Sequence, residues 1–416
     1  MDPLTPASEQ PVSDPGQRAP AAFLLLCGVG LLAIFSSTMS KSPVLPLFAD
    51  YLGARDATLG LIAAASTYTG IVLSIPAGVL SDRLGRRLVL LGSGLVFASA
   101  PVLYLFVHSP GALAAVRAYH GIATAVFGPV AMAYVADLAP VRRGERMGLF
   151  SSATLIGRSL APLAGGFLLA LSFHAVYVGC AIAGAIALAL AWMLPRSAQR
   201  QGAARAGLRD ALREAGQGLG QTVRNRAILC ASGAEAVIYL CFGAIETFLP
   251  LYAIQHRIPT WQIGIIFAAQ IITVALTKPL LGGLSDRVGR IPVISGGLML
   301  GAGALVGLSL LSGAWGLGVA AAMFGLALSA VTSATSAFVS DLSRARHYGA
   351  ALGVLSTIMD VGHSTGPVLA GALVGALSYQ PTFRLIAALP VAMALVLLLT
   401  VRSAPRERVT ARSDAR

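Results

Sequence analysis

Charged residues are scarce in this sequence of 416 residues. Only 11% of the residues are Asp, Glu, Lys or Arg, whereas 56% are hydrophobic. Soluble globular domains carry about 25% charged residues. The composition therefore excludes an ordinary soluble protein and places the chain in a lipid bilayer.

Acidic residues are the rarer of the two charged kinds, with 17 Asp and Glu against 30 Lys and Arg, which gives a net charge of +13. Such a surplus could indicate a nucleic-acid partner. The arginines, however, lie in short loops between apolar runs and not on a polar face interleaved with aromatic residues. Membrane topology explains them better, and we expect no nucleic-acid partner.

Motifs of common catalytic and metal sites are also missing. The four cysteines lie inside apolar runs without a CxxC pair, so we expect neither a disulfide nor a metal site. The sequence contains no G-x4-G-K-[ST] loop for ATP, no H-E-x-x-H and no nucleophile–base pair. We therefore predict that the protein is not an enzyme and has no cofactor.

Long apolar runs are abundant instead. A helix needs about 20 apolar residues to cross the hydrocarbon core, and runs of this length cannot be barrel strands. We predict twelve membrane-spanning helices, near residues 21–47, 58–80, 88–107, 111–136, 147–170, 174–194, 227–253, 261–284, 292–312, 315–340, 348–377 and 382–401.

The two halves of the sequence repeat each other. The run Gly78–Arg87 (GVLSDRLGRR) returns 204 residues later as Gly282–Arg290 (GGLSDRVGR). A second pattern returns at an offset of 205, where Gly148, Gly157, Pro162, Gly165 and Gly166 correspond to Gly353, Gly362, Pro367, Ala370 and Gly371. The chain is a tandem duplication, and matched residues should lie at equal depth in parallel repeats.

Charge and apolar runs together predict the organisation of the chain. Basic residues concentrate in alternate loops, so the positive-inside rule places both termini in the cytoplasm. We predict two tails, two six-helix bundles and a cytoplasmic linker that contains an amphipathic helix. Their limits are 1–20 (disordered tail), 21–194 (first bundle), 195–226 (linker), 227–401 (second bundle) and 402–416 (tail).

The repeated motifs resemble those of the major facilitator superfamily of transporters. Gly78–Arg87 resembles its motif A, and Gly148–Gly166 resembles its motif C, which is typical of proton-coupled efflux branches. Leu113–Gly121 resembles motif B, except that His120 replaces the usual Gln. The resemblance covers about residues 21–402 and implies two six-helix bundles around a central cavity that opens alternately to either side.

Motif A predicts a latch at the cytoplasmic end. A carboxylate there can face the positive end of a neighbouring helix, which in this family is helix 11, and its arginines can pair with an acid at the end of helix 4. The alternative is a basic loop that only fixes topology. The predicted latch residues are Gly78, Asp82, Arg83, Gly85, Arg86, Arg87, Asp137 and Asp286.

Motif C supplies small residues and a proline to helix 5. The glycines Gly148, Gly157, Gly165 and Gly166 permit close helix packing, and Pro162 removes a backbone hydrogen bond and kinks the helix. Ordinary packing is the plainer interpretation of the same glycines.

Seven ionisable residues besides histidine fall within the predicted spans away from their ends, where each costs roughly 2.5–3.5 kcal/mol unless it is paired or hydrated. Glu235, Tyr239, Phe242 and Glu246 share one helix face, and Asp360 and His363 are three residues apart. Lys278 is expected to snorkel to the membrane surface. We predict that Glu246, Asp360, Glu235, His363 and Arg117 serve proton coupling, and that Lys41, Arg158, Tyr239, His120 and Gln270 line the substrate cavity.

The duplication predicts one further contact. Ile245 lies 204 residues after Lys41, so Lys41 and Glu246 differ by one residue in equivalent depth. In the family that the chain resembles, their helices meet on the outer side, and we predict an ion pair that closes the outer gate. The alternative is that Lys41 snorkels outward and Glu246 bonds to Thr247.

These inferences predict an all-α secondary transporter of the cytoplasmic membrane, a monomer that exports a small molecule in exchange for protons. The alternative is a proton symporter that takes up a polar or anionic metabolite. A non-transporting sensor on the same fold is a more remote interpretation, because it predicts decay of motif A and of the intramembrane charges, and both are present.

Overall fold

The computed structural model describes residues 15–138, 142–195, 213, 216, 226–342 and 348–402. Most of the predicted linker and nearly all of both predicted tails lie outside these residues. The described part of the first half is helical, with elements α1 (Pro15–Met39), α2 (Val44–Tyr51), α3 (Asp56–Leu84), α4 (Arg86–Tyr104), α5 (Pro110–Leu138), α6 (Arg143–Leu169) and α7 (Phe173–Trp192).

The second half follows the same plan, with elements α9 (Arg226–Gln255), α10 (Thr260–Val288), α11 (Arg290–Leu310), α12 (Ala314–Leu342), α13 (Tyr348–Leu377) and α14 (Tyr379–Arg402). Every predicted span is helical, and eleven helical segments of the described chain are long and apolar enough to cross a membrane. The predicted all-helical membrane fold is therefore confirmed. α13 is not among the eleven, and it carries Asp360 and His363 in its middle.

The first predicted span, 21–47, is not one helix. α1 ends at Met39 and α2 begins at Val44, with a turn between them. Pro43 lies in this turn and has no amide hydrogen to donate, which ends the regular hydrogen-bonding pattern of α1. Lys41 therefore sits in a helix break inside the membrane, and its carbonyl accepts a hydrogen bond from the Leu45 amide.

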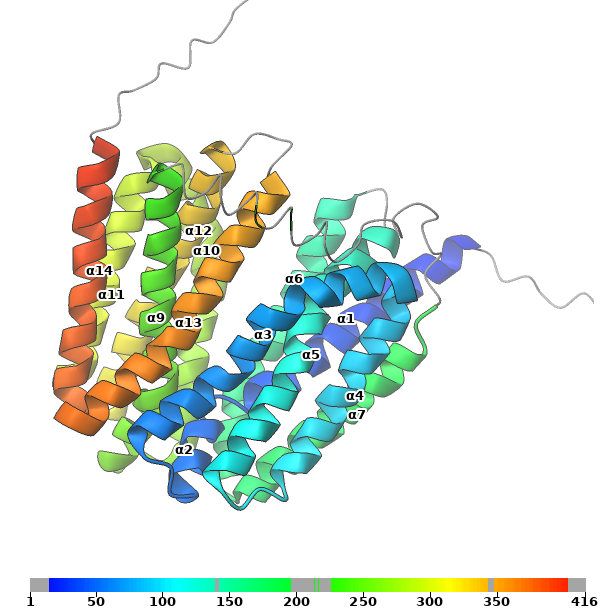
Figure 1. Ribbon diagram of the computed structural model, residues 1–416, viewed down its shortest axis with the longest axis horizontal. Helices are drawn as coiled ribbons and strands as arrows, with labels where there is room; N and C mark the ends of the chain where they lie inside the picture. The colour runs from blue at the N-terminus through cyan, green and yellow to red at the C-terminus, as the bar shows by residue number, and fades with distance from the viewer. Residues whose placement is uncertain are drawn as a thin grey trace, which may run out of the picture.

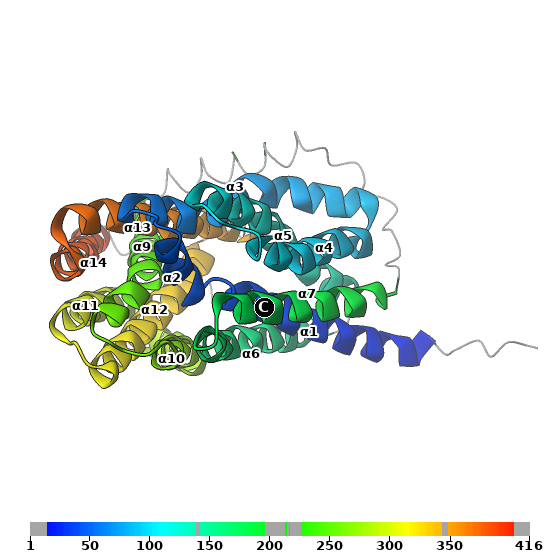
Figure 2. The ribbon, with the colours of Figure 1, turned by 90° about the horizontal axis from the view of Figure 1, so that it is seen from below.

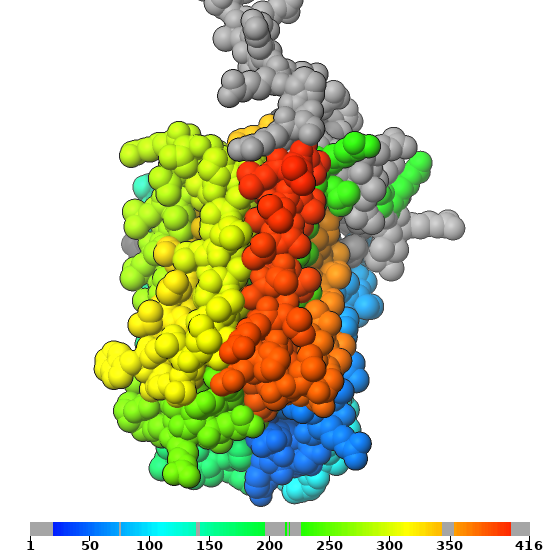
Figure 3. All heavy atoms as spheres, turned by 90° about the vertical axis from the view of Figure 1, so that its left-hand side faces the viewer, coloured from blue at the N-terminus to red at the C-terminus, as the bar shows by residue number. Residues whose placement is uncertain are grey.

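The helices of each half pack mainly on one another, and two large contacts join the halves. α3 packs against α13, and α6 packs against α10. In Figures 1 and 2 the helices α9–α14 form one side of the molecule and α1–α7 the other, and α2 lies against α9. Figure 3 shows the outer side of α11 and α14. Exposed leucines of these two helices, such as Leu310, Leu395 and Leu399, would contact lipid.

Equivalent glycines make equivalent contacts in the two halves. A Cβ added to Gly121 of α5 would lie 2.6 Å from the carbonyl oxygen of Ser66 on α3, so these backbones touch. In the second half a Cβ on Gly325 would lie 2.4 Å from the carbonyl oxygen of Gln270. The sequence repeat is thus a repeat of helix packing.

The halves meet closely at one end, which we call the closed end, where the loops at residues 52–55, 170–172 and 256–259 lie. A Cβ on Gly60 would lie 2.3 Å from the Pro367 carbonyl oxygen, and one on Gly264 would lie 2.4 Å from the Pro162 carbonyl oxygen. The Phe167 and Trp261 rings also stack across α6 and α10 with centroids 6.1 Å apart.

The opposite end carries the turns at Gly85 and Gly289, and we call it the basic end. An added Cβ would have nothing within 4 Å at three glycines near this end, Gly78, Gly148 and Gly353. In Figure 1 the two sets of helices diverge towards this end. The structure thus represents a state in which the halves touch at the closed end and part at the basic end.

Candidate functional site

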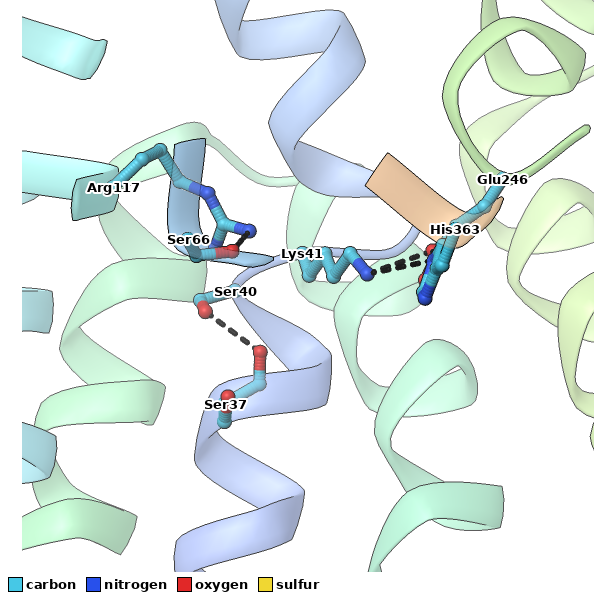
Figure 4. Close-up of polar contacts among 7 residues, drawn as sticks. All are labelled: Ser37, Ser40, Lys41, Ser66, Arg117, Glu246 and His363. Carbon is cyan, nitrogen blue, oxygen red and sulfur yellow. Dashed lines mark hydrogen bonds and ion pairs between the residues drawn. The ribbon is translucent and has the colours of Figure 1, made fainter. Parts of the chain in front are cut away.

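Three polar side chains from three elements meet where the halves touch. Lys41 Nζ lies 2.8 Å from Glu246 Oε2, and His363 Nε2 lies 3.0 Å from the same oxygen. Lys41 Nζ also lies 3.4 Å from His363 Nε2 (Figure 4). The lysine comes from the break between α1 and α2, the glutamate from α9 and the histidine from α13. We call these three residues the polar triad.

Local packing brings the triad together. A Cβ on Gly243 would lie 2.5 Å from the carbonyl oxygen of His363, so α9 and α13 are in backbone contact at this level. Glu246 follows Gly243 by three residues and therefore lies on the same face of α9. The break before Pro43 places Lys41 opposite that face. The predicted ion pair between Lys41 and Glu246 is present in the structure.

The triad is shielded from water. The exposed fractions of the Lys41, Glu246 and His363 side chains are 24%, 12% and 17%. In such surroundings a charge is costly unless an opposite charge and hydrogen bonds compensate it. Glu246 has both kinds of partner, because an ammonium group and an imidazole lie beside one of its oxygens.

The imidazole nitrogen that faces the other two residues has two possible roles. With a proton, Nε2 donates a hydrogen bond to Glu246; without one, it accepts a hydrogen bond from Lys41. It cannot do both at once. The geometry thus lets His363 hold or release one proton at Nε2 next to a carboxylate.

Two aromatic rings of α9 lie beside the His363 ring of α13. The His363 ring centroid lies 5.3 Å from that of Phe242 and 6.0 Å from that of Tyr239. These rings come from the helix face that the sequence predicts to line the cavity. Glu235, on the same predicted face, is separate from the triad, because it is buried and accepts a hydrogen bond from Thr335 of α12.

Two further charges lie near the triad without touching it. Arg158 of α6 is exposed, and its charge acts on His363 and Tyr239. Asp360 of α13 is half-buried, and the charge of Lys41 acts on it. Within the described residues, neither side chain has a hydrogen-bond or ion-pair partner.

Motif B residues lie inside the first half. Arg117 is buried, and its Nη2 donates to Ser66 Oγ at 2.6 Å (Figure 4). His120 is also buried, with Nδ1 3.5 Å from the Tyr104 hydroxyl and its ring edge-on to Phe97. This packing does not fit the prediction that His120 lines a cavity, because the face of α5 that carries motif B is turned towards α3 and α4.

Gln270 is equally enclosed. It occupies the position equivalent to Ser66, and its side chain is fully buried. Neither its amide nitrogen nor its amide oxygen has a hydrogen-bond partner among the described residues. The second half has Ala321 at the position of Arg117, so the arginine that satisfies Ser66 has no counterpart beside Gln270. A cavity-lining position for Gln270 does not fit this burial.

Both copies of motif A form the same ionic arrangement. Arg86 pairs with Asp82 and Asp137 and donates to Ser81 Oγ at 2.6 Å. In the second half, Arg290 pairs with Asp286 and with Asp341 and donates to Ser285 Oγ at 2.7 Å.

The other latch arginines take different positions. Arg87 donates to the Trp192 carbonyl and not to Asp137, so that part of the prediction is wrong for this state. Its guanidinium is directed towards the end of α7, whereas Arg86 follows the turn at Gly85 directly. Arg83 is exposed on the last turn of α3. The predicted contact of Asp82 with the start of helix 11 is untested, because the side chains of 348–352 are outside the described set.

Motif C serves two interfaces. A Cβ on Gly157 would lie 2.3 Å from the Leu31 carbonyl oxygen of α1, within the first half. Gly166, one turn past Pro162, instead contacts the backbone of Gly264 on α10, across the halves. Gly165 packs beside Met39. The same helix therefore holds its own half together and closes against the other.

Sequence reasoning missed several residues of these sites. Ser66, Thr335 and Gly243 have no motif around them, and only the fold shows that they meet Arg117, Glu235 and His363. Ser285 and Arg290, in contrast, were detectable, because they are the repeat counterparts of Ser81 and Arg86.

Comparison with known proteins decides the family. Residues 26–268 and 261–416 match the family model of the Major Facilitator Superfamily. The chain belongs to the major facilitator superfamily. It is therefore a multi-pass membrane protein and a secondary transporter of a small-molecule substrate, and not an enzyme.

This transporter is similar to several curated proteins. It is 26% identical over 385 residues to an uncharacterised MFS-type transporter of Methanocaldococcus jannaschii, covering 91% of this chain and 96% of that protein. It is 28% identical over 346 residues to the multidrug resistance protein MdtG of Proteus mirabilis (80% and 84% covered). It is 22% identical over 362 residues to the quinolone resistance protein NorA of Staphylococcus aureus (84% and 87% covered).

Solved structures show the same fold at lower identity. A point mutant of the nucleoside transporter NupG has a TM-score of 0.81 at 14% identity, with 91% of this chain and 99% of that chain covered. A bacterial homologue of the lysosomal transporter Spinster, inward-facing and occupied, has a TM-score of 0.79 at 16% identity (94% and 98% covered). These likenesses support the fold alone.

Proposed function

We propose that this transporter exports small molecules in exchange for protons across the cytoplasmic membrane, with both termini and the basic end in the cytoplasm. The observation that carries the proposal is the polar triad, because it joins a titratable pair to a contact between the halves. Export agrees with the similarity to MdtG, a multidrug resistance protein, and to NorA, a quinolone resistance protein.

The triad couples proton binding to the closed end through one carboxylate. When Glu246 is charged, its attraction to Lys41 ties the break of α1 and α2 to α9 and so holds the halves together. When Glu246 takes up a proton, Lys41 faces a neutral carboxyl group, and the attraction between two opposite charges is lost. His363, which contacts the same oxygen, is the group through which that proton would pass.

Competition at the triad would make the exchange obligatory. In the state described here, release of the proton towards the open basic end re-forms the Lys41–Glu246 pair and keeps the closed end shut. A substrate that enters from the basic end and binds beside the triad would weaken that pair and permit the closed end to part. Asp360 and Glu235 are the second and third candidates for the proton site, because each is a carboxyl group within a membrane helix.

The proposal is tested with purified protein in liposomes under an imposed pH gradient, with a panel of labelled compounds added outside. An antiporter accumulates its substrate when the lumen is acidic, because protons then leave as the substrate enters. A symporter accumulates it when the outside is acidic, and a sensor accumulates nothing in either case. We expect accumulation only with the acidic lumen.

Glu246→Gln provides the matching variant. We expect it to abolish gradient-driven accumulation while exchange of labelled for unlabelled substrate persists, because exchange needs no net proton movement. Asp360→Asn and Glu235→Gln are made in parallel. If all three variants keep full gradient-driven transport, the proton site lies elsewhere, and if accumulation is the same with and without a gradient, proton coupling is wrong.

A further inference from the structure

The polar triad leaves two intramembrane charges of opposite sign outside it. Arg158 on α6 belongs to the first half and Asp360 on α13 to the second. Throughout the part of the chain that the structure describes, no side chain forms a hydrogen bond or an ion pair with either of them. Each such group is costly in a membrane interior unless water or a ligand reaches it.

Both charges act on the same aromatic surface. Asp360 lies one turn before His363 on α13, and the His363 ring lies against Tyr239 and Phe242. Tyr239 is within electrostatic range of both Arg158 and Asp360. Arg158 follows Gly157, whose tight contact with α1 fixes this part of α6. The two charges come from opposite halves, and both act on Tyr239.

Arg158 and Asp360 do not neutralise each other, although they share this surface. The structure gives no ion pair between them, and the acid charge that pairs with Lys41 is that of Glu246. A molecule that places a negative group on Arg158, a positive group on Asp360 and an apolar body on the rings would satisfy all three features. A molecule with one charge would leave the other protein charge unpaired.

We propose that the substrate is a small zwitterion with an aromatic body, whose acidic group binds Arg158 and whose basic group binds Asp360. Such a ligand bridges α6 and α13 and therefore the two halves of the transporter. This inference rests on the proposed transport function and specifies its substrate class. It differs from binding of a lipophilic cation, which needs Asp360 alone, and of an organic anion, which needs Arg158 alone.

Matched ligands test the proposal with the full-length protein in lipid nanodiscs at equilibrium, without a pH gradient. Three series are used, built on phenyl, indolyl and naphthyl frameworks. Each series contains the zwitterionic amino acid, the amine that lacks the carboxylate and the acid that lacks the amine. In the phenyl series these are phenylalanine, 2-phenylethylamine and 3-phenylpropanoate. Affinity is measured by isothermal titration calorimetry.

In at least one series we expect the zwitterion to bind about tenfold or more tightly than both of its analogues, because a second charge-assisted hydrogen bond is worth at least that much. Arg158→Gln should remove the advantage over the amine, and Asp360→Asn the advantage over the acid. Each variant should leave the other comparison intact. Arg55→Gln and Asp50→Asn, on exposed residues of the closed end, are the matched controls and should change neither.

The proposal is overturned if a singly charged analogue binds as tightly as its zwitterion in every series, if no probe binds, or if the controls lower the advantage as much as the site variants do. Binding at equilibrium needs no pH gradient, so it is measured whether or not protons drive transport. A failed preference alongside gradient-driven transport of other compounds would therefore refute the substrate class and leave the proposed function standing. Conversely, a zwitterion preference without gradient-driven transport would refute proton coupling and leave the substrate class standing.

Discussion

Reversing the charges of the Lys41–Glu246 pair tests whether it holds the closed end together. Removing one partner of a dry buried pair costs about 3–5 kcal/mol. Lys41 is 24% exposed, so water screens part of the interaction and we expect roughly 2 kcal/mol for the loss of either charge, which lowers the closed-to-open ratio about 30-fold. Lys41→Glu alone and Glu246→Lys alone should each lower the closed-to-open ratio by at least this factor, because each places two like charges side by side.

Cross-linking at a distant point of the same end measures that ratio. The stacked rings of Phe167 and Trp261 lie across α6 and α10, so a cysteine at each position, in a background without the four native cysteines, reacts with a short bifunctional thiol reagent only when the end is closed. Each single reversal should slow the reaction, and the double reversal should restore it. Arg55→Gln, outside the pair, should have no effect.

The reasoning fails if the double reversal cross-links no faster than the single reversals. In that case the two residues contribute independently to packing or solvation, and their proximity in this state does not close the gate. Equal cross-linking in all variants would show instead that the glycine contacts between the halves are sufficient without the charges.

Three other predictions concern the latch and the helix contacts. The Asp82→Asn variant should insert normally but transport several-fold more slowly in proteoliposomes. Asp286→Asn should slow transport less, because the Asp286 side chain is 62% exposed and that of Asp82 only 36%. An equal effect of the two variants would contradict the role of burial. Gly264→Val should abolish Phe167–Trp261 cross-linking and transport, since its side chain meets a carbonyl at 2.4 Å, whereas Gly148→Ala in open space should be silent. Gly243→Val should destabilise the α9–α13 contact by about 1–3 kcal/mol, seen as a lower midpoint in thermal aggregation, and an unchanged midpoint would refute the tight contact.

Much of the fold was predictable because bilayer chemistry restricts the possibilities. Apolar runs of sufficient length must be helices in lipid, and the repeat offset fixes which helices are equivalent. The offset also placed Lys41 and Glu246 at nearly equal depth, and the structure joins them. That prediction needed no knowledge of side-chain packing, since parallel repeats alone set the depth.

The rest depended on how helices cross. His363 was predicted beside Asp360, its neighbour on α13, but the structure turns it to Glu246, because the backbone contact at Gly243 brings α9 within reach. His120 was predicted at a cavity from its motif alone, yet the face that carries it packs on α3 and α4. Interhelical contacts of this kind leave no periodic pattern in either helix.

The composition of α13 has a consequence for how the protein is made. It is the span of 30 residues that falls outside the eleven apolar ones of the described chain, because its middle carries Asp360, His363 and several hydroxyl groups. Such a segment partitions poorly from the translocation channel into lipid by itself. α9 is synthesised earlier and offers it a carboxylate and the close backbone contact at Gly243. The polar groups that we propose for the transport cycle thus make insertion of α13 depend on the earlier insertion of α9.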